Sequence, residues 1–317
     1  MTKPTHFLSI DQLSAQEFAD YLAVAAYLKR RRAQGVAEHA LAGKTLAMIF
    51  EKPSLRTRLS FEVAMNELGG RSVFVRGEEV GIGAREPAKD VARVVGGYVQ
   101  AIMARVFKHQ TILDFAHYSG VPVINGLCDR HHPCQAMADF LTMREHFGNL
   151  QNLRVVFVGD ANNVCRSLAR AAVLAGARFT LACPPGYGFT PEDRTDLGPA
   201  WNDQVREVNE PAAAAAGAQV LYTDVWTSMG QEAQKERRLR DFQGYQINEG
   251  LLRIADPAAV VMHCLPAHRD EEITDAAVEH PRSLIFQQAE NRLHAQKAIL
   301  RLLLANDAAK VIAIARS

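Results

Sequence analysis

The sequence predicts an α/β protein of two domains, each a mostly parallel sheet flanked by helices. Short apolar strands alternate with helical segments along the chain, which is typical of parallel sheets with helices on both faces. A polar stretch, Gly148–Asn152, reads as a linker that divides this alternation into two series. The 317 residues are long for one hydrophobic core and sufficient for two. The last helix has no strand partner, so we expect it to pack back on the first domain.

The first series opens with a helix. Ser14 and Glu17 have the spacing of a capping box, and the basic run Lys29–Arg32 suits the negative end of the helix dipole. A helix from Cys134 to His146 closes this half. The candidate strands between them are Thr45–Phe50, Ser72–Val75, Ala101–Val106 and Val121–Asn125.

The second series follows the polar stretch. Its candidate strands are Arg154–Gly159, Arg178–Ala182, Ala218–Asp224, Val260–Cys264 and Leu284–Gln287. The alanine run Ala212–Ala216 predicts a short helix that ends at Gly217, and the amphipathic last helix spans Asn291 to Ala305. We therefore expect a first domain at residues 1–147 with 291–317, and a second domain at residues 148–290.

Composition excludes several classes of protein. The net charge of +1 provides no strong field for nucleic acid or an anionic membrane. The five cysteines form no CxxC pair, which favours a reducing, cytoplasmic setting. The amino terminus lacks the apolar core of a signal peptide, and we expect no membrane-spanning segment because no apolar run is long enough.

The stretch Glu51–Glu62 (EKPSLRTRLSFE) places polar residues between a buried strand and a helix. Such a turn offers unpaired backbone N–H groups at the positive end of the helix dipole, and Ser54, Arg56 and Thr57 add hydroxyl and guanidinium donors. This combination suits a phosphate, although the turn lacks the glycines of a P-loop. A surface ion-pair turn capped by Ser54 or Thr57 is an equal alternative on this segment alone.

Two further segments of the first half carry candidate residues. Arg105 stands in an apolar strand, so it either meets a buried carboxylate, which this segment alone favours, or points into an anion site. His132 and Gln135 lie between a strand end and a helix, where ligands bind in such sheets. His131, His132 and Cys134 lack the spacing of a structural zinc site, so we expect no metal.

The second half carries polar residues at three strand ends. Asn162 and Asn163 either cap the next helix or contact a polar ligand, and the GDANN segment lacks the G-x-G-x-x-G pattern of dinucleotide sites. Asp224 follows a strand and suits an ammonium group. Cys264 is either a nucleophile or, more commonly, a buried structural cysteine.

Taken together, the segments form an ordered series. EKPSLRTRLSFE, ARVF, HPCQAMAD, GDANN, DVWTSMGQE, MHCLPAHRDEE and AENR resemble the transcarbamylase family of aspartate and ornithine carbamoyltransferases over nearly the whole chain. SxRTR and HPxQ are shared across that family, whereas DVWxSMG and HCLPAHR are similar to its ornithine-using members. Two departures, Asp270 where glycine is common and Gly96-Gly97-Tyr98, lie outside the residues that match.

The resemblance implies transfer of the carbamoyl group of carbamoyl phosphate to the side-chain amine of ornithine, a step of arginine metabolism. The first domain would then bind carbamoyl phosphate and the second ornithine. The matching carbamoyl phosphate residues are Ser54, Leu55 through its backbone, Arg56, Thr57, Arg105, His132, Gln135, Cys264, Leu265 and Arg292. The matching ornithine residues are Asn163, Asp224, Ser228 and Met229, and the residues expected in catalysis are Arg105, His132, Asp224 and Cys264.

The resemblance further implies a homotrimer without cofactor or metal, in which the loop Gly77–Asp90 reaches towards a neighbouring subunit. Putrescine and an N-acylated ornithine are alternative acceptors. Aspartate is disfavoured, because an acidic acceptor requires more cationic side chains than the second half offers. A nicotinamide-dependent reductase is disfavoured by the missing glycine pattern, and a non-catalytic binder by the complete set of matching residues. The direction of the reaction, assembly beyond a trimer and allosteric control stay open.

Overall fold

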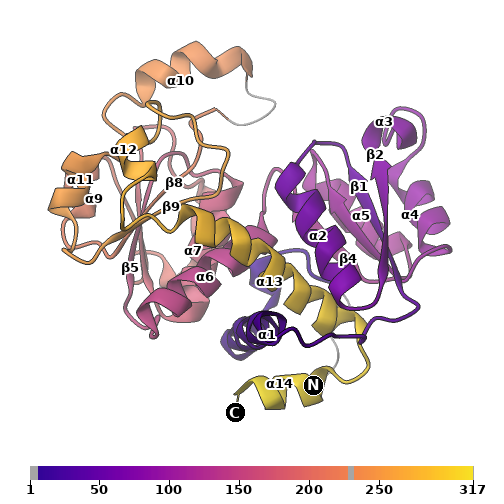
Figure 1. Ribbon diagram of the computed structural model, residues 1–317. Helices are drawn as coiled ribbons and strands as arrows, with labels where there is room; N and C mark the ends of the chain where they lie inside the picture. The colour runs from indigo at the N-terminus through magenta and orange to yellow at the C-terminus, as the bar shows by residue number, and fades with distance from the viewer. Residues whose placement is uncertain (1–5, 228–231, 317) are drawn as a thin grey trace. The chain divides into compact units, whose positions relative to one another are not determined.

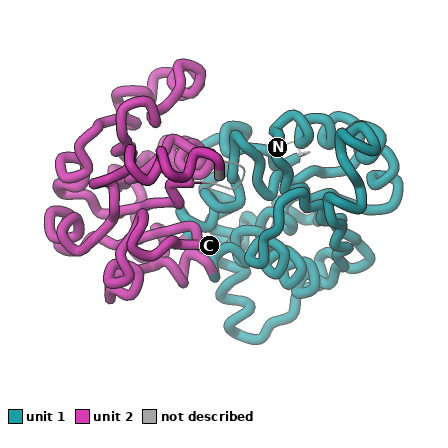
Figure 2. The backbone as a smooth tube through the Cα atoms, turned by 90° about the horizontal axis from the view of Figure 1, so that it is seen from above, with its two compact units in different colours: residues 1–141, 290–317 teal, residues 142–289 magenta. Residues whose placement is uncertain are grey.

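The computed structural model describes residues 6–227 and 232–316, and it contains two compact α/β units (Figures 1 and 2). Unit 1 comprises residues 1–141 and 290–317, and unit 2 comprises residues 142–289. Each unit is built on one parallel sheet flanked by helices, as the alternation of strands and helices predicted. Within the described ranges, no helix is long and apolar enough to span a bilayer.

The sheet of unit 1 has four parallel strands in the order β2-β1-β3-β4. The strands are β1 (Thr45–Phe50), β2 (Arg71–Arg76), β3 (Ala101–Arg105) and β4 (Val123–Leu127). The helices are α1 (Ala15–Ala33), α2 (Leu55–Glu67), α3 (Gly77–Val80), α4 (Ala88–Gly96), α5 (His109–Tyr118), α6 (Pro133–Phe147), which continues into unit 2, and α14 (Ala308–Arg316). All four strands predicted for this half are present.

The C-terminal helices pack on unit 1, which confirms that expectation. Helix α13 (Ile285–Leu304) places Lys297 Nζ 2.8 Å from Glu67 on α2. On α14, Arg316 forms an ion pair of 2.6 Å with the buried Asp20 of α1. The predicted capping box of α1 is also confirmed, because Ser14 and Glu17 exchange side-chain and backbone hydrogen bonds.

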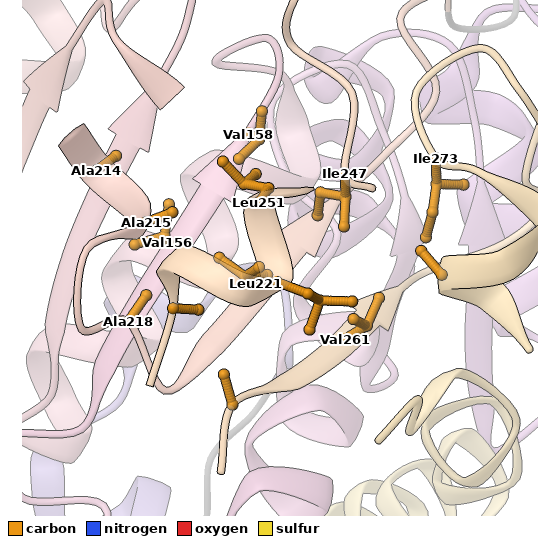
Figure 3. Close-up of a cluster of buried hydrophobic side chains, with 14 of the residues drawn as sticks. Val156, Val158, Ala214, Ala215, Ala218, Leu221, Ile247, Leu251, Val261 and Ile273 are labelled. Atoms are coloured by element: carbon orange, nitrogen blue, oxygen red, sulfur yellow. The ribbon is translucent and has the colours of Figure 1, made fainter. Parts of the chain in front are cut away.

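The sheet of unit 2 has five parallel strands in the order β7-β6-β5-β8-β9. The strands are β5 (Arg154–Val158), β6 (Arg178–Ala182), β7 (Val205–Val208), β8 (Val220–Thr223) and β9 (Val260–His263). The helices are α7 (Asn163–Ala175), α8 (Pro191–Leu197), α9 (Pro211–Ala215), α10 (Lys235–Asp241), α11 (Glu249–Ile254) and α12 (Asp275–Val278). Figure 3 shows how Val156, Leu221 and Val261 from three of these strands pack with α9 and α11 in one apolar core.

One expectation for this half was wrong, and one strand was missed. Leu284–Gln287 is not a strand: the backbone N–H of Leu284 donates to Val261 on β9, and the chain then turns into α13 at Ile285. A short apolar run does not distinguish strand from helix by its periodicity. Strand β7 was not predicted, because its sequence, VREV, is an edge strand with charged residues.

Both sheets have a switch point, where successive connections leave in opposite directions. In unit 1 it lies between β1 and β3, and in unit 2 it lies between β5 and β8. Ligands of open α/β sheets bind at the carboxyl ends of strands beside such points. The turn after β1 holds Ser54, and the residues after β5 and β8 hold Asn162 and Asp224, so the fold brings the candidate residues to these edges.

Candidate active site

The turn after β1 leads into the N-terminus of α2, where Ser54 is the capping residue. Ser54 is the N-cap of α2, and its hydroxyl accepts from the backbone N–H of Thr57 at 3.3 Å and donates to the Thr57 hydroxyl at 3.0 Å. The side chain of Leu55 is 71% exposed and its backbone opens the helix. Arg56 lies half-buried in the first turn. A hydroxyl cap and a first-turn arginine are thus present at the positive end of the helix dipole.

A buried hydrogen-bonded cluster lies beside this helix end. Arg292 on α13 donates to the Thr57 hydroxyl at 3.2 Å and to the side-chain oxygen of Gln135 at 2.6 Å. Gln135 in turn donates to Asp139 at 2.8 Å. All four side chains are buried. The cluster thereby joins α2, α6 and α13, and it presents a fixed cation with an ordered amide.

His132 and Arg105 are buried in the same unit. Arg105 is the last residue of β3, and His132 immediately precedes α6. Burial lowers the pKa of His132 well below its ordinary value, and the positive charges of Arg292 and Arg105 lower it further. Burial also lowers the pKa of Lys52 in the turn after β1, again with help from Arg105. His132 is therefore a neutral imidazole at pH 7, able to donate one hydrogen bond and accept another.

Cys134, the cysteine weighed as a zinc ligand, is a protonated thiol. Its Sγ donates to the backbone carbonyl of Asn125 at 3.4 Å. Burial raises its pKa to about 12. A metal ligand must be a thiolate, so this environment favours the structural interpretation of Cys134.

In unit 2, Asp224 and Cys264 meet at the carboxyl ends of β8 and β9. Cys264 Sγ donates to one carboxylate oxygen of Asp224 at 2.9 Å. The side-chain amide of Asn162 donates to the other oxygen at 2.8 Å, while its own oxygen caps α7. Both groups are neutral donors. Among the residues described, no cation is paired with the buried carboxylate of Asp224.

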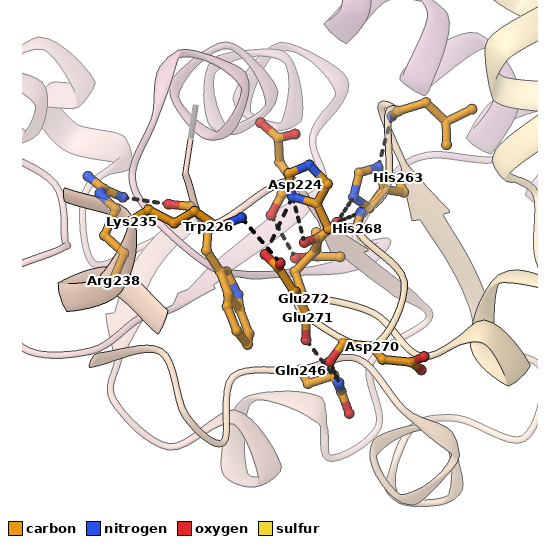
Figure 4. A network of polar contacts seen from close by, with 12 residues as sticks. Asp224, Trp226, Lys235, Arg238, Gln246, His263, His268, Asp270, Glu271 and Glu272 are labelled. Carbon is orange, nitrogen blue, oxygen red and sulfur yellow. Dashed lines mark hydrogen bonds and ion pairs between the residues drawn. The ribbon is translucent and has the colours of Figure 1, made fainter. Parts of the chain in front are cut away.

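The turn after β9 is held by a buried histidine and glutamate (Figure 4). The backbone N–H of Leu265 donates to Nδ1 of His263 at 2.8 Å, so Nδ1 is unprotonated and the ring proton is on Nε2. Nε2 then donates to Glu272 Oε1 at 3.0 Å, and the same oxygen accepts from the backbone N–H of His268 at 2.7 Å. Leu265 has a positive φ of 56°. Glu272 thus ties both ends of the turn that carries Cys264.

An ion pair braces the segment after β8. Arg238 on α10 lies 2.5 Å from Asp160 and donates to the backbone carbonyl of Trp226 at 2.8 Å. Burial raises the pKa of Asp160, and the opposing effect of Arg238 is smaller. The Trp226 ring stacks on Phe242 with centroids 5.7 Å apart, which is a packing contact. This network fixes the chain that leads from Asp224 towards residue 227.

The structure connects some predicted site residues and leaves others apart. Ser54, Thr57, Gln135 and Arg292 form one hydrogen-bonded group, and Asp224 and Cys264 form another. The Asn163 carboxamide oxygen accepts from the adjacent Val164 N–H, a local contact. Ser228 and Met229 lie outside the described residues. The sequence analysis missed the contacts of His263 and Glu272, because no spacing rule relates these two residues.

Comparisons with known proteins agree with this architecture. The family model described as the carbamoyl-P binding domain of aspartate/ornithine carbamoyltransferase matches residues 5–145. The model described as the Asp/Orn binding domain of the same family matches residues 151–303. The chain belongs to the aspartate/ornithine carbamoyltransferase family.

Individual relatives show which members of this family the chain is similar to. An ornithine carbamoyltransferase from Archaeoglobus fulgidus is 50% identical over 95% of this chain and 98% of its own length. Another ornithine carbamoyltransferase, from Thermus thermophilus, is 49% identical over 96% of this chain and 98% of its own length. The solved ornithine carbamoyltransferase from Pyrococcus furiosus has a TM-score of 0.90 at 44% identity, covering 94% of this chain and 96% of its own. A solved N-acetyl-L-ornithine transcarbamylase mutant has a TM-score of 0.85 at 31% identity, covering 95% and 100%.

Proposed function

We propose that the protein is an enzyme that transfers the carbamoyl group of carbamoyl phosphate to the side-chain amine of L-ornithine, giving L-citrulline and phosphate. The observation that carries the choice of acceptor is the buried Asp224 carboxylate, whose hydrogen bonds come from two neutral groups. Such a carboxylate favours a cationic substrate and opposes an acidic one such as aspartate. Close relatives named ornithine carbamoyltransferase support the same substrate.

Residues 1–147 with 291–317 are proposed to bind carbamoyl phosphate, and residues 148–290 to bind ornithine. Arg56 and the backbone N–H groups that start α2 hold the phosphate, because this helix end offers donors and positive charge. Leu55 contributes only its backbone, which agrees with its exposed side chain. The carbamoyl phosphate residues are Ser54, Leu55, Arg56, Thr57, Arg105, His132, Gln135, Cys264, Leu265 and Arg292, and the ornithine residues are Asn163, Asp224, Ser228 and Met229.

The chemistry follows from these roles. The neutral amine attacks the carbamoyl carbon, a C–N bond forms, and the C–O bond to phosphate breaks while the nitrogen loses a proton. Arg105 and the neutral imidazole of His132 donate hydrogen bonds to the carbamoyl oxygen as negative charge develops on it. A free amine of this kind has a pKa near about 10, so Asp224 and Cys264 are proposed to position it and assist its deprotonation. Arginines neutralise the phosphate, so the scheme needs no metal ion.

We further infer a cytoplasmic homotrimer. Five free cysteines fit a reducing compartment. The segment Gly77–Asp90 is similar to a loop that reaches a neighbouring subunit in the family. It contains the short helix α3, which has no buried side chain and could therefore contact another subunit. Light scattering of the purified protein tests the trimer directly.

The first experiment measures citrulline formation from carbamoyl phosphate and ornithine. Putrescine, N-acetylornithine and aspartate run in parallel as acceptors. The likeness to an N-acetyl-L-ornithine transcarbamylase makes the acylated amine the main alternative. Preference for ornithine supports the proposal. Activity only with another amine keeps the carbamoyl phosphate assignment and overturns the acceptor, and no activity with any acceptor refutes both.

A further inference from the structure

A cavity of about 220 Å³ lies in unit 2 at the amino ends of β5, β6 and β7. It is at the opposite end of the strands from Asp224 and Cys264, so it does not belong to the proposed active site. Its polar lining includes three arginines from these three strands, namely Arg154, Arg178 and Arg206, together with Thr180, Asn202, Asp203 and Gln204. We propose that this cavity binds a phosphate group, either free or at the end of a small phosphomonoester.

Strand register places the three arginines on one face of the sheet. Arg154 is directly opposite Arg178 in the parallel pair β5–β6. Thr180, two residues further along β6 on the same face, is opposite Arg206 on β7. Like charges that are opposite one another across strands destabilise a sheet. An anion in the cavity removes this repulsion, which gives the arrangement a physical reason.

The three arginines differ in the hydrogen-bond and ion-pair partners that they have within the protein. Arg154 donates from Nε to the carbonyl of Gly217 and lies 3.4 Å from Asp256, so it has structural partners. Arg206 donates from Nε to the neutral hydroxyl of Thr180 at 3.0 Å. Within residues 6–227 and 232–316, neither Arg178 nor Arg206 forms an ion pair. These two guanidinium groups, together with the Thr180 hydroxyl proton, are the donors available to a phosphate.

The other lining residues limit the size of the ligand and favour one sign of its charge. Ala214, Ala216 and Ala218 line the cavity together with Val156, and Figure 3 shows Ala214, Ala218 and Val156 in the same region of unit 2. Their small side chains leave the space that larger residues would fill. Asp203 is the one acidic residue of the lining against three arginines, so the balance favours an anion. The volume suits a phosphate or small ester better than a nucleotide cofactor, since larger ligands occupy roughly 300–1,000 Å³.

The test titrates phosphate into the full-length protein and separates this cavity from the proposed active site. The variant Arg56→Gln weakens the proposed active-site phosphate contact, and the part of the remaining binding that substitutions of the cavity arginines remove reports the cavity. In that background, Arg178→Gln or Arg206→Gln should weaken phosphate binding about tenfold or more. Arg253→Gln, which removes an exposed arginine of the same unit outside the cavity, should leave the affinity within about twofold.

Calorimetry with inorganic phosphate and with glycerol 3-phosphate distinguishes the two sources. Saturable binding that Arg178→Gln or Arg206→Gln weakens supports the proposal, and the tighter ligand identifies the source. An unchanged affinity in both of these variants overturns it. Asp203→Asn should strengthen binding, which keeps the test valid if an arginine variant fails to fold. No saturable binding in the Arg56→Gln protein overturns the proposal. An equal loss with Arg253→Gln also overturns it, because the binding would then follow net charge alone. Neither result depends on whether the protein carbamoylates ornithine.

Discussion

His263 Nε2 lies 3.0 Å from Glu272 Oε1, and both side chains are fully buried (Figure 4). The imidazole accepts the backbone N–H of Leu265 on its other nitrogen, so the carboxylate acts on the turn through the ring. Glu272, nine positions after His263 in the sequence, therefore sets the position of Cys264 and Leu265 through that ring. This role is one of positioning, since Glu272 hydrogen-bonds neither Cys264 nor Asp224 directly.

Glu272→Ala should lower turnover about tenfold or more and destabilise the protein by roughly 1–3 kcal/mol, because it leaves a buried imidazole N–H without an acceptor. Glu272→Gln keeps an acceptor oxygen, so it should recover most of the turnover. Steady-state kinetics and urea unfolding measure the two effects. Glu271→Gln, a half-exposed neighbour, is the matched control.

A second readout separates positioning from general instability. The other four cysteines are buried, so iodoacetamide under native conditions reports on Cys264. The Glu272→Ala change should alter the rate and pH dependence of this alkylation, and Glu272→Gln should alter it less. Wild-type alkylation and wild-type turnover in the alanine variant would contradict the positioning role.

Asp224→Asn should reduce turnover with ornithine by about 100-fold, within the range expected for loss of a proton-transfer group. The amide cannot carry the negative charge that the carboxylate offers the amine, while Asn162 and Cys264 remain in place. The KM for carbamoyl phosphate should change little. Asp196→Asn, an exposed aspartate of the same unit, serves as the control. An unchanged pH–rate profile in Asp224→Asn would refute this role.

Arg56→Gln should weaken carbamoyl phosphate binding by about tenfold or more and leave the unfolding midpoint nearly unchanged. Arg58→Gln is the matched control, because Arg58 lies two residues along the same helix and instead pairs with Glu62 at 2.9 Å. The control should lose at most about 1 kcal/mol of stability and no affinity. Calorimetric titration with carbamoyl phosphate checks both, and equal losses of affinity would refute the assignment of Arg56.

His132 should make stability fall at acid pH. Burial lowers its folded-state pKa below the ordinary 6.5, so between 6.5 and the folded value the unfolded chain binds a proton that the folded chain does not. The contribution of His132 to the free energy of unfolding is therefore complete above pH 6.5. It is lost as the pH falls below 6.5, by at most about 1.4 kcal/mol per pH unit. His132→Gln should flatten that slope in urea unfolding at several pH values. His117→Gln, an exposed histidine, should leave the slope unchanged, and equal slopes in all three proteins would contradict the prediction.

Local patterns determined much of the fold and the identity of the candidate site. Of the nine strands in the described residues, eight were predicted, because short apolar runs mark strands within a few residues of sequence. Helix α1 was predicted from the capping box of Ser14 and Glu17, which is equally local. The polar turn at Ser54 and the strand-end Asp224 were recognised for the same reason. The edge strand β7 and the helical start of α13 were not, since their short patterns are ambiguous until a neighbouring strand or helix packs on them.

Only the tertiary structure decided which residues meet. The amide of Asn162 reaches Asp224 because β5 and β8 are neighbours in the sheet, and Arg292 reaches Gln135 because α13 packs on unit 1. The burial of Glu272 against His263 and the alignment of Arg154 with Arg178 have the same origin. Such contacts depend on strand order, register and helix packing between distant segments. Sequence periodicity reports the face of an element, whereas the partner of that face is set by the folded chain.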